Sequence, residues 1–303
     1  MQPSENLTAT NTQTSALARH WRLRSRSLGF ERGPAIMGIV NVTPDSFSDG
    51  GSYLAPQTAV DHALRLEDAG ADILDIGGES TRPYSQPVSH ENELRRIVPV
   101  LELLAHRVSV PISIDTSKSS VAQAAIDLGA EIVNDVTGLE ADPRMAELVA
   151  RTGVGICAMH MRGTPQTMQD KPYYVDVVQE IFEYLRQRDE WLRTQEIAAE
   201  RICLDPGIGF GKTHQHNLLL LQNAEKFLKL GRPILVGHSR KGFIGKLLGD
   251  NDCSRDAATA GISLAMAMKG IQVLRVHDVA STRDGLTGWM ACGDGTDYHT
   301  TPN

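Results

Sequence analysis

The chain has little cysteine, no long apolar run and no excess of positive charge. Four cysteines, Cys157, Cys203, Cys253 and Cys292, are scattered over 303 residues without the spacing of a zinc site or the density of a disulfide framework. We interpret them as buried free thiols, which is typical of a reducing cytoplasm. No run approaches the roughly 20 apolar residues of a membrane span, and the N-terminus lacks the apolar core of a secretory signal. We therefore expect a cytoplasmic protein without a membrane partner.

The charge balance argues against one large class of partner. The chain carries 30 lysines and arginines against 37 aspartates and glutamates, which gives a formal net charge of −7. A nucleic-acid-binding domain is usually strongly basic, so we expect no nucleic-acid partner. An anionic substrate stays compatible with this balance, because a local basic pocket is enough to bind it.

Eight short apolar runs alternate with amphipathic stretches along almost the whole chain. Short runs that end in polar residues are typical of buried parallel strands, and the longer stretches between them are typical of helices. The expected strands are residues 36–40, 73–76, 112–114, 132–133, 155–159, 202–204, 234–236 and 273–276. The expected helices are residues 58–69, 91–105, 119–128, 144–152, 175–199, 216–230, 257–268 and 279–290.

This alternation predicts an α/β fold, a single-domain (β/α)8 TIM barrel over residues 18–292, with a short hairpin at 21–30 that covers its bottom. An open doubly wound sheet is the alternative, but it would usually carry a glycine fingerprint after its first strand, and none is present. Residues 1–17 are rich in Ser, Thr, Asn and Gln and predict a disordered tail, and residues 293–303 predict a flexible one. The arginines just after the first tail leave an organellar transit peptide open as a less favoured alternative.

Polar side chains follow the expected strands at the point where each one ends. The run 36–40, for example, leads into a loop with a proline, two aspartates and three hydroxyl side chains. The carboxyl ends of barrel strands converge on one face, so these side chains would line one pocket. For any one of them, a simple strand cap is an equally good interpretation, but not for all the strands together. The residues are Asn41, Asp75, Asp115, Asn134, Met159, His160, Asp205, Lys241, Arg275 and His277.

Three of these residues suit a flat heterocycle. Asp115, Asn134 and Asp205 supply carboxylates and an amide, and a carboxylate pairs in bidentate fashion with an edge of two N–H donors such as a pterin presents. The alternative is that Asp115 and Asp205 are interior carboxylates that balance Lys241.

A second set is cationic and suits a diphosphate. Arg275 and His277 are two residues apart on one strand, so both side chains point to the same side. A magnesium ion could assist, with one oxygen from Asn41 and the rest from phosphate and water. The alternative for Arg82 and Arg240 is a solvated surface position. The segment 237–243 also begins a helix, whose free N–H groups can receive a carboxylate or phosphate.

The order of these motifs resembles dihydropteroate synthase, a pterin-binding family of folate biosynthesis, over roughly residues 20–292. The resemblance implies a transferase that condenses 6-hydroxymethyl-7,8-dihydropterin pyrophosphate with p-aminobenzoate to give 7,8-dihydropteroate and pyrophosphate. It also implies Mg2+, a homodimer, a sulfonamide target and substitution at the pterin methylene. The matching motifs are residues 37–51, 75–83, 113–116, 134–136, 159–168, 205–209, 239–241 and 275–278.

The resemblance also implies roles for single residues. Asn41 would meet the magnesium and pyrophosphate, and Arg275 and His277 would anchor the pyrophosphate. Asp49, Arg82 and Lys241 would be catalytic, with Asp49 steadying the cationic pterin intermediate. The implied pterin-binding residues are Asp115, Asn134, Met159, Asp205, Phe210 and Lys241. The residues implied at the p-aminobenzoate end are Phe47, Thr81, Arg82, Pro83 and Ser239.

Two departures from the family pattern concern the p-aminobenzoate end. Tyr84 and Ser85 stand where many relatives carry Gly-Ala, so the second loop is expected to be stiffer. Gly242 stands where some relatives carry Ser, which leaves backbone N–H groups to hold a carboxylate. Two other functions stay open: a pterin-dependent methyltransferase, which would not need the 41–47 loop, and a non-catalytic paralogue, which would be expected to lose site residues.

Overall fold

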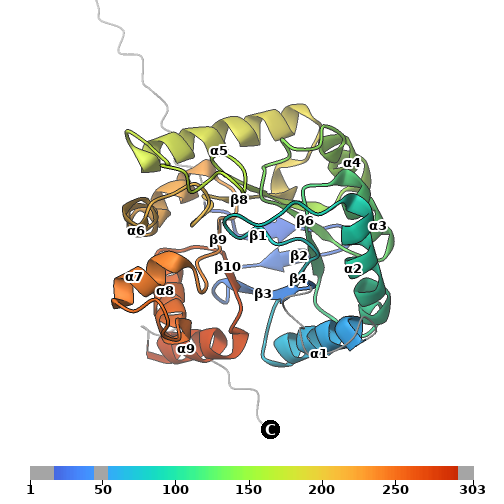
Figure 1. The fold of residues 1–303 in the computed structure, drawn as a ribbon, viewed down its shortest axis with the longest axis horizontal. Coiled ribbons are helices and arrows are strands. Elements are labelled where there is room, and N and C mark those ends of the chain that lie inside the picture. Colours follow the sequence, from blue (N-terminus) through green and yellow to red (C-terminus); the bar gives the residue numbers. More distant parts are fainter. Residues whose placement is uncertain (1–16, 44–53, 293–303) are drawn as a thin grey trace, which may run out of the picture.

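The computed structural model describes residues 17–43 and 54–292, and within these ranges a ring of helices surrounds a sheet of eight parallel strands (Figure 1). The strand order is β8-β7-β6-β5-β4-β3-β10-β9, and a single bridge between Leu204 and Ile234 joins the two edges. The predicted (β/α)8 barrel is therefore confirmed. The strands are β3 Ala35–Asn41, β4 Ile73–Gly77, β5 Ile112–Asp115, β6 Ile132–Asp135, β7 Gly155–Met159, β8 Ile202–Asp205, β9 Leu235–Val236 and β10 Val273–Val276.

The helices follow the predicted order with two corrections. The stretch predicted as one helix at 216–230 is α6 followed by a 3-10 helix, Ala224–Leu230, because Asn223 ends α6 and its Nδ2 donates to the Leu219 carbonyl at 2.8 Å. The short α7 was predicted only as a helix start. The helices are α1 Leu54–Asp68, α2 His90–Leu104, α3 Ser119–Asp127, α4 Arg144–Thr152, α5 Val177–Thr194, α6 His214–Gln222, α7 Gly242–Leu248, α8 Asp256–Met268 and α9 Val279–Cys292. None of the helices in the described ranges is long and apolar enough to span a bilayer.

Strand alternation divides the apolar core in two. Side chains on one side of each strand pack against the surrounding helices, whereas those on the other side fill the barrel interior. The interior cluster also contains Trp21 and Leu23, from the hairpin of β1 His20–Arg22 and β2 Ser27–Gly29. Both side chains are buried, and Trp21 Nε1 donates to the Arg201 carbonyl at 2.9 Å. The hairpin therefore covers the barrel bottom, as predicted.

The cysteine prediction holds only in part. All four cysteines lie within the described residues and are free, and Cys157 and Cys203 are buried partners in the β7–β8 register. Cys253 is only partly buried and Cys292 is exposed, so for these two the prediction of burial was wrong. Cys292 is the last residue of α9, beyond the part of that helix that packs on the barrel. Apart from Leu17, the two predicted tails lie outside the described residues.

Candidate active site

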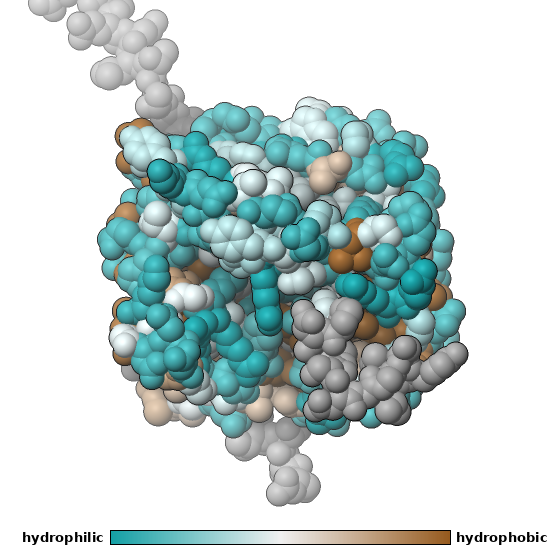
Figure 2. All heavy atoms as spheres, in the orientation of Figure 1, coloured by the Kyte–Doolittle hydropathy of each residue, from teal (hydrophilic) through white to brown (hydrophobic). Residues whose placement is uncertain are grey.

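The polar strand ends meet at one end of the barrel because of the same alternation that builds its core. Ile73 belongs to the interior cluster at the bottom, so Asp75, two residues later on β4, points to the same interior near the top. By the same alternation, the side chains of Asp115 on β5, Asn134 on β6 and Arg275 on β10 point to the interior near the top. The face of the molecule seen in Figure 2 is mostly hydrophilic.

One guanidinium connects two buried carboxylates across this end of the barrel. Arg275 donates from Nε to Asp75 Oδ2 at 2.6 Å and from Nη2 to Asp115 Oδ2 at 2.7 Å. Asn134 Nδ2 donates to the same Asp75 oxygen at 3.1 Å. Burial raises the pKa of Asp115 to about 7, although Arg275 opposes the shift. Asp115 can therefore be ionised or protonated near neutral pH, depending on what binds beside it.

Asp205 and Lys241 form the opposite side of the site. Asp205 Oδ1 accepts a hydrogen bond from the Gly207 N–H at 2.6 Å. Lys241, at the start of α7, donates to the Ile208 carbonyl, and its Nζ lies 4.4 Å from the centre of the Phe210 ring. Burial lowers the pKa of Lys241 to about 7, and the charge of Asp205 limits that shift. These contacts fix the loop after β8 against the N-terminus of α7.

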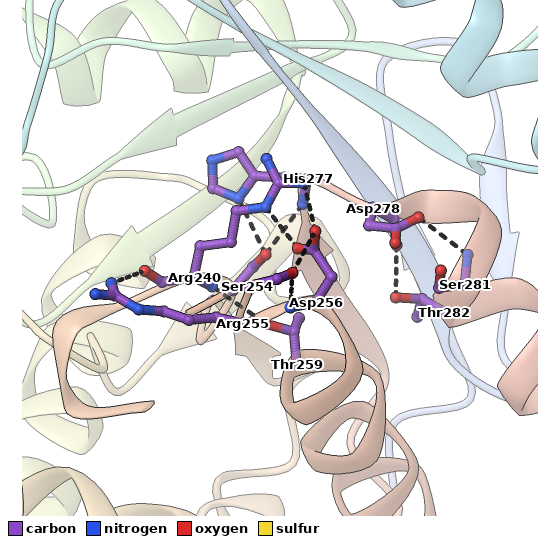
Figure 3. A network of polar contacts seen from close by, with 10 residues as sticks. Arg240, Ser254, Arg255, Asp256, Thr259, His277, Asp278, Ser281 and Thr282 are labelled. Carbon is purple, nitrogen blue, oxygen red and sulfur yellow. Dashed lines mark hydrogen bonds and ion pairs between the residues drawn. The ribbon is translucent and has the colours of Figure 1, made fainter. Parts of the chain in front are cut away.

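His277 lies in a polar network with Arg240 and Asp256 (Figure 3), and Ser239 contacts its imidazole. The Ser239 Oγ is 3.0 Å from His277 Nδ1 and also accepts the His277 backbone N–H at 3.2 Å. Burial, together with the positive charges of Arg275, Arg240 and Arg82, lowers the pKa of His277 to about 3. The imidazole is therefore neutral, so one ring nitrogen carries a proton and the other is an acceptor.

Arg240 is exposed at the surface, as the alternative interpretation expected, but its side chain is ion-paired. Its Nε and Nη2 contact the two carboxylate oxygens of Asp256 at 2.6 and 3.1 Å, and its backbone N–H donates to Thr259 Oγ1 (Figure 3). Its φ of 55° is left-handed. These contacts fix the connection between β9 and α7, where Ser239 and Lys241 flank Arg240.

The remaining predicted residues occupy the rim. Asn41 ends β3 and is partly buried, and Met159 ends β7 and is buried. Thr81 is partly buried, whereas Arg82 and Pro83 are exposed in the segment between β4 and α2.

Comparison with known proteins shows the family to which this chain belongs. A family model described as "Pterin binding enzyme" matches residues 37–277. The dihydropteroate synthase of Neisseria meningitidis serogroup B is 47% identical over 285 residues, which cover 91% of this chain and 99% of that protein. The Escherichia coli K12 dihydropteroate synthase is 45% identical over 253 residues, 84% of this chain and 89% of that one.

The chain belongs to the dihydropteroate synthase family. Solved structures of this family share the fold. A Xanthomonas albilineans dihydropteroate synthase with 4-aminobenzoic acid aligns with a TM-score of 0.85 and 42% identity, covering 92% of this chain and 100% of that one. A second structure of the X. albilineans protein holds 7,8-dihydropteroate and aligns with a TM-score of 0.82 and 40% identity, covering 91% and 100%. The chain is accordingly a transferase of the dihydropteroate synthase class.

Most of the dihydropteroate synthase residues predicted from the sequence gather at the carboxyl ends of the strands. Phe47 and Asp49 lie outside the described residues. Arg275 was predicted beside the pyrophosphate, and the structure adds that its guanidinium already pairs with Asp75 and Asp115. The individual roles of these residues stay predictions.

Two lysines near the site, the buried Lys212 and the partly buried Lys118, were not predicted as site residues. Lys212 is 2% exposed, and its Nζ lies 3.0 Å from His160 Nδ1 and 2.8 Å from the Phe210 carbonyl. Lys118 Nζ pairs with Glu79 and with the fully buried Glu93, both at 2.5 Å. The only sequence signal was that each lysine lies two or three residues after a site motif, 113–116 for Lys118 and 205–209 for Lys212.

Proposed function

We propose that this chain condenses 6-hydroxymethyl-7,8-dihydropterin pyrophosphate with p-aminobenzoate to give 7,8-dihydropteroate and pyrophosphate. The observation that carries the proposal is the joint presence of Asp75, Asp115, Asn134 and Arg275 in one buried network at the carboxyl ends of the strands. Such a network offers acceptors to the N–H edge of a flat pterin. Neighbouring structures that hold 4-aminobenzoic acid or 7,8-dihydropteroate support the choice of substrates.

The residues of this chain would act on the two ends of the pterin substrate. Asp115 and Asp205 accept from ring N–H groups, and their negative charge stabilises the cation that develops at the methylene carbon. A guanidinium has five N–H donors, and the two carboxylate contacts of Arg275 use two, so donors remain for diphosphate oxygens. In the tautomer whose Nδ1 accepts the Ser239 O–H, His277 would offer an N–H from Nε2. Lys241, with its pKa lowered by burial to about 7, is suited to exchange a proton near neutral pH.

A magnesium ion suits the donors at this end of the barrel. No group of three His, Cys, Asp or Glu residues that could hold a metal exists within residues 17–43 and 54–292, so a cage built from the described protein ligands is not offered. Mg2+ commonly takes one or two protein oxygens and completes its shell with phosphate and water. Asn41 supplies such an oxygen at the end of β3. When bound, the ion would neutralise charge on the leaving pyrophosphate.

A product assay tests the proposed function directly. Purified protein is incubated with the pterin pyrophosphate, p-aminobenzoate and magnesium, and 7,8-dihydropteroate and pyrophosphate are measured separately. Formation of both in equal amounts supports the proposal. Binding of pterin without either product would favour the non-catalytic paralogue. Methyl transfer from a methylated folate in a parallel assay would favour the methyltransferase. A sulfonamide is expected to compete with p-aminobenzoate; a Yersinia pestis relative has been solved in complex with a sulfonamide drug.

We also propose a homodimer, formed across α7 and α8. Met268 on α8 is 70% exposed, and Leu247 and Leu248 on α7 are 52% and 47% exposed. Gly261 has open space around it, so a second helix can approach α8 closely there. Light scattering on the parent and on Gly261→Arg tests this face. A dimeric parent and a monomeric variant support it, whereas a dimeric variant would place the interface elsewhere.

A further inference from the structure

The segment that follows β4 contains a β-turn with an unfavourable residue at its second central position. The Ser85 N–H donates to the Arg82 carbonyl at 3.1 Å, with Pro83 and Tyr84 at the two central positions. Tyr84 has a φ of 64°. Proline first and a positive φ second define a type II turn, in which the second position strongly favours glycine or asparagine. A tyrosine there is strained, so other contacts must hold the turn in this form.

Those contacts come from the segment that follows β7. The Tyr84 N–H donates to the Pro165 carbonyl at 2.9 Å, and Gln166 Nε2 donates to the Ser85 carbonyl at 2.8 Å. The Tyr84 hydroxyl lies 3.5 Å from Asp170 Oδ1, at the long limit of a hydrogen bond. The first two hydrogen bonds therefore hold residues 82–85 against the segment that follows β7. We name this contact between residues 82–85 and 163–170 the clasp.

The clasp crosses the end of the barrel. Strands β5 and β6 stand between β4 and β7 in the sheet, so a contact between the segments after β4 and β7 passes over the ends of β5 and β6. Those ends carry Asp115 and Asn134. The teal segment that follows β4 crosses the middle of the ring of helices in Figure 1. Arg82, in the same turn, is close enough to His277 for its charge to lower the pKa of that residue.

We propose that Gln166 and Tyr84 are positioning residues of the condensation: they set how firmly residues 82–85 dock over the pterin-binding residues, and so how well Arg82 is placed for p-aminobenzoate. This rests on the proposed function. Gln166 stabilises the docked turn by a hydrogen bond. The strain at Tyr84 opposes it and keeps the undocked form accessible, which allows the pterin to reach Asp115 and Asn134.

The two residues are therefore expected to act in opposite directions. Gln166→Ala removes one docking bond and should raise the KM for p-aminobenzoate about fivefold, the factor expected for one neutral hydrogen bond. Tyr84→Gly relieves the backbone and should lower the same KM by about threefold. The KM for the pterin substrate should change by less than about twofold in both variants, since neither residue contacts the ring-binding groups. Glu196→Gly is the matched control, because Glu196 is exposed, has a φ of 64° and follows α5 at the opposite end of the barrel.

Hydrogen exchange of the peptide containing residues 82–86 gives a readout that needs no substrate. Exchange should be faster than in the parent for Gln166→Ala, slower for Tyr84→Gly and unchanged for Glu196→Gly. An inactive parent with this exchange pattern would refute the proposed function and the kinetic role but leave the clasp in place. Exchange or KM values that shift in the same direction for Gln166→Ala and Tyr84→Gly, or that do not shift, would overturn the proposal. If Gln166→Ala fails to fold, Gln166→Glu, which loses the donor and keeps the shape, replaces it with the same expected direction.

Discussion

Removal of the Arg275 guanidinium is the perturbation whose consequences the structure defines most closely. Arg275→Ala would leave Asp75, which is fully buried, and Asp115, which is 8% exposed, as neighbouring carboxylates. Removing one partner of a buried ion pair costs about 3–5 kcal/mol. Asp115 can take up a proton near neutral pH, which reduces the cost, so we expect about 3 kcal/mol. At about 2–4 °C per kcal/mol for a chain of this size, the Tm should fall by roughly 6–12 °C.

The loss of stability in Arg275→Ala should depend on pH, because the protonation of Asp115 decides how much charge is left unpaired. Burial already raises the pKa of Asp115 to about 7, and loss of Arg275, which lowers it, will raise it further. Between the unfolded value of about 4 and this raised value, the folded variant binds more protons than the unfolded chain, so its stability falls as pH rises. The difference in Tm between parent and variant should therefore be larger at about pH 7.5 than at about pH 5.

Thermal unfolding at both pH values, with a matched arginine variant, is the assay. Arg283 pairs with Asp72 at 2.6 Å, but both side chains are partly exposed, so Arg283→Ala should cost only about 1 kcal/mol. In Arg275→Ala alone, the activation free energy of turnover should rise and the binding free energy of pyrophosphate should weaken, each by about 2–4 kcal/mol, because a charge-assisted contact is lost. A Tm loss no larger than that of Arg283→Ala, or equal at both pH values, would refute the reasoning.

Three further predictions concern other parts of the molecule. Asp205→Asn should weaken pterin binding by roughly 1–3 kcal/mol and lower turnover without unfolding the protein, because a hydrogen-bond acceptor is replaced by a donor that faces a donor of the pterin. Calorimetry, steady-state rates and Tm on one sample check this, and an unaltered pterin affinity would exclude Asp205 as an anchor. p-Aminobenzoate should bind poorly alone and more tightly with pyrophosphate and magnesium present, since the rim segments contribute to its site; equal affinities in two calorimetric titrations would contradict this. Trp21→Ala should lower the stability by about 3–5 kcal/mol, because it leaves a cavity at the barrel bottom, and the Tm should fall accordingly. The kcat measured well below the Tm should stay unchanged, and a parallel loss of kcat would show that the hairpin also shapes the site.

The sequence predicted the barrel and the side of each strand that carries chemistry because both follow from local periodicity. Every predicted strand is present, and Arg275 lies on the last of them, with His277 directly after its end. The bonding partners of Arg275 could not be predicted in this way. Asp75 and Asp115 are 200 and 160 residues away along the chain, so only the closed sheet shows that one guanidinium serves both.

The helices show a similar limit. α7 has only seven residues and begins at Gly242, so its pattern is too short for a period to be seen. The expectation of a stiffer second loop came from comparing Tyr84 and Ser85 with the family pattern. The contacts that hold this loop, to Pro165 and Gln166, are 81 residues distant and required the structure.

The hairpin that covers the bottom has a kinetic consequence. Trp21 and Leu23 fill the interior at that end, so among the described residues the bottom is closed and the carboxyl end is left as the entrance. Both products of a condensation must then leave by the route that both substrates use to enter. While one product occupies that route, neither new substrate can complete its site. For a barrel with a single entrance, inhibition by accumulated product and an ordered departure of the two products are the expected kinetics.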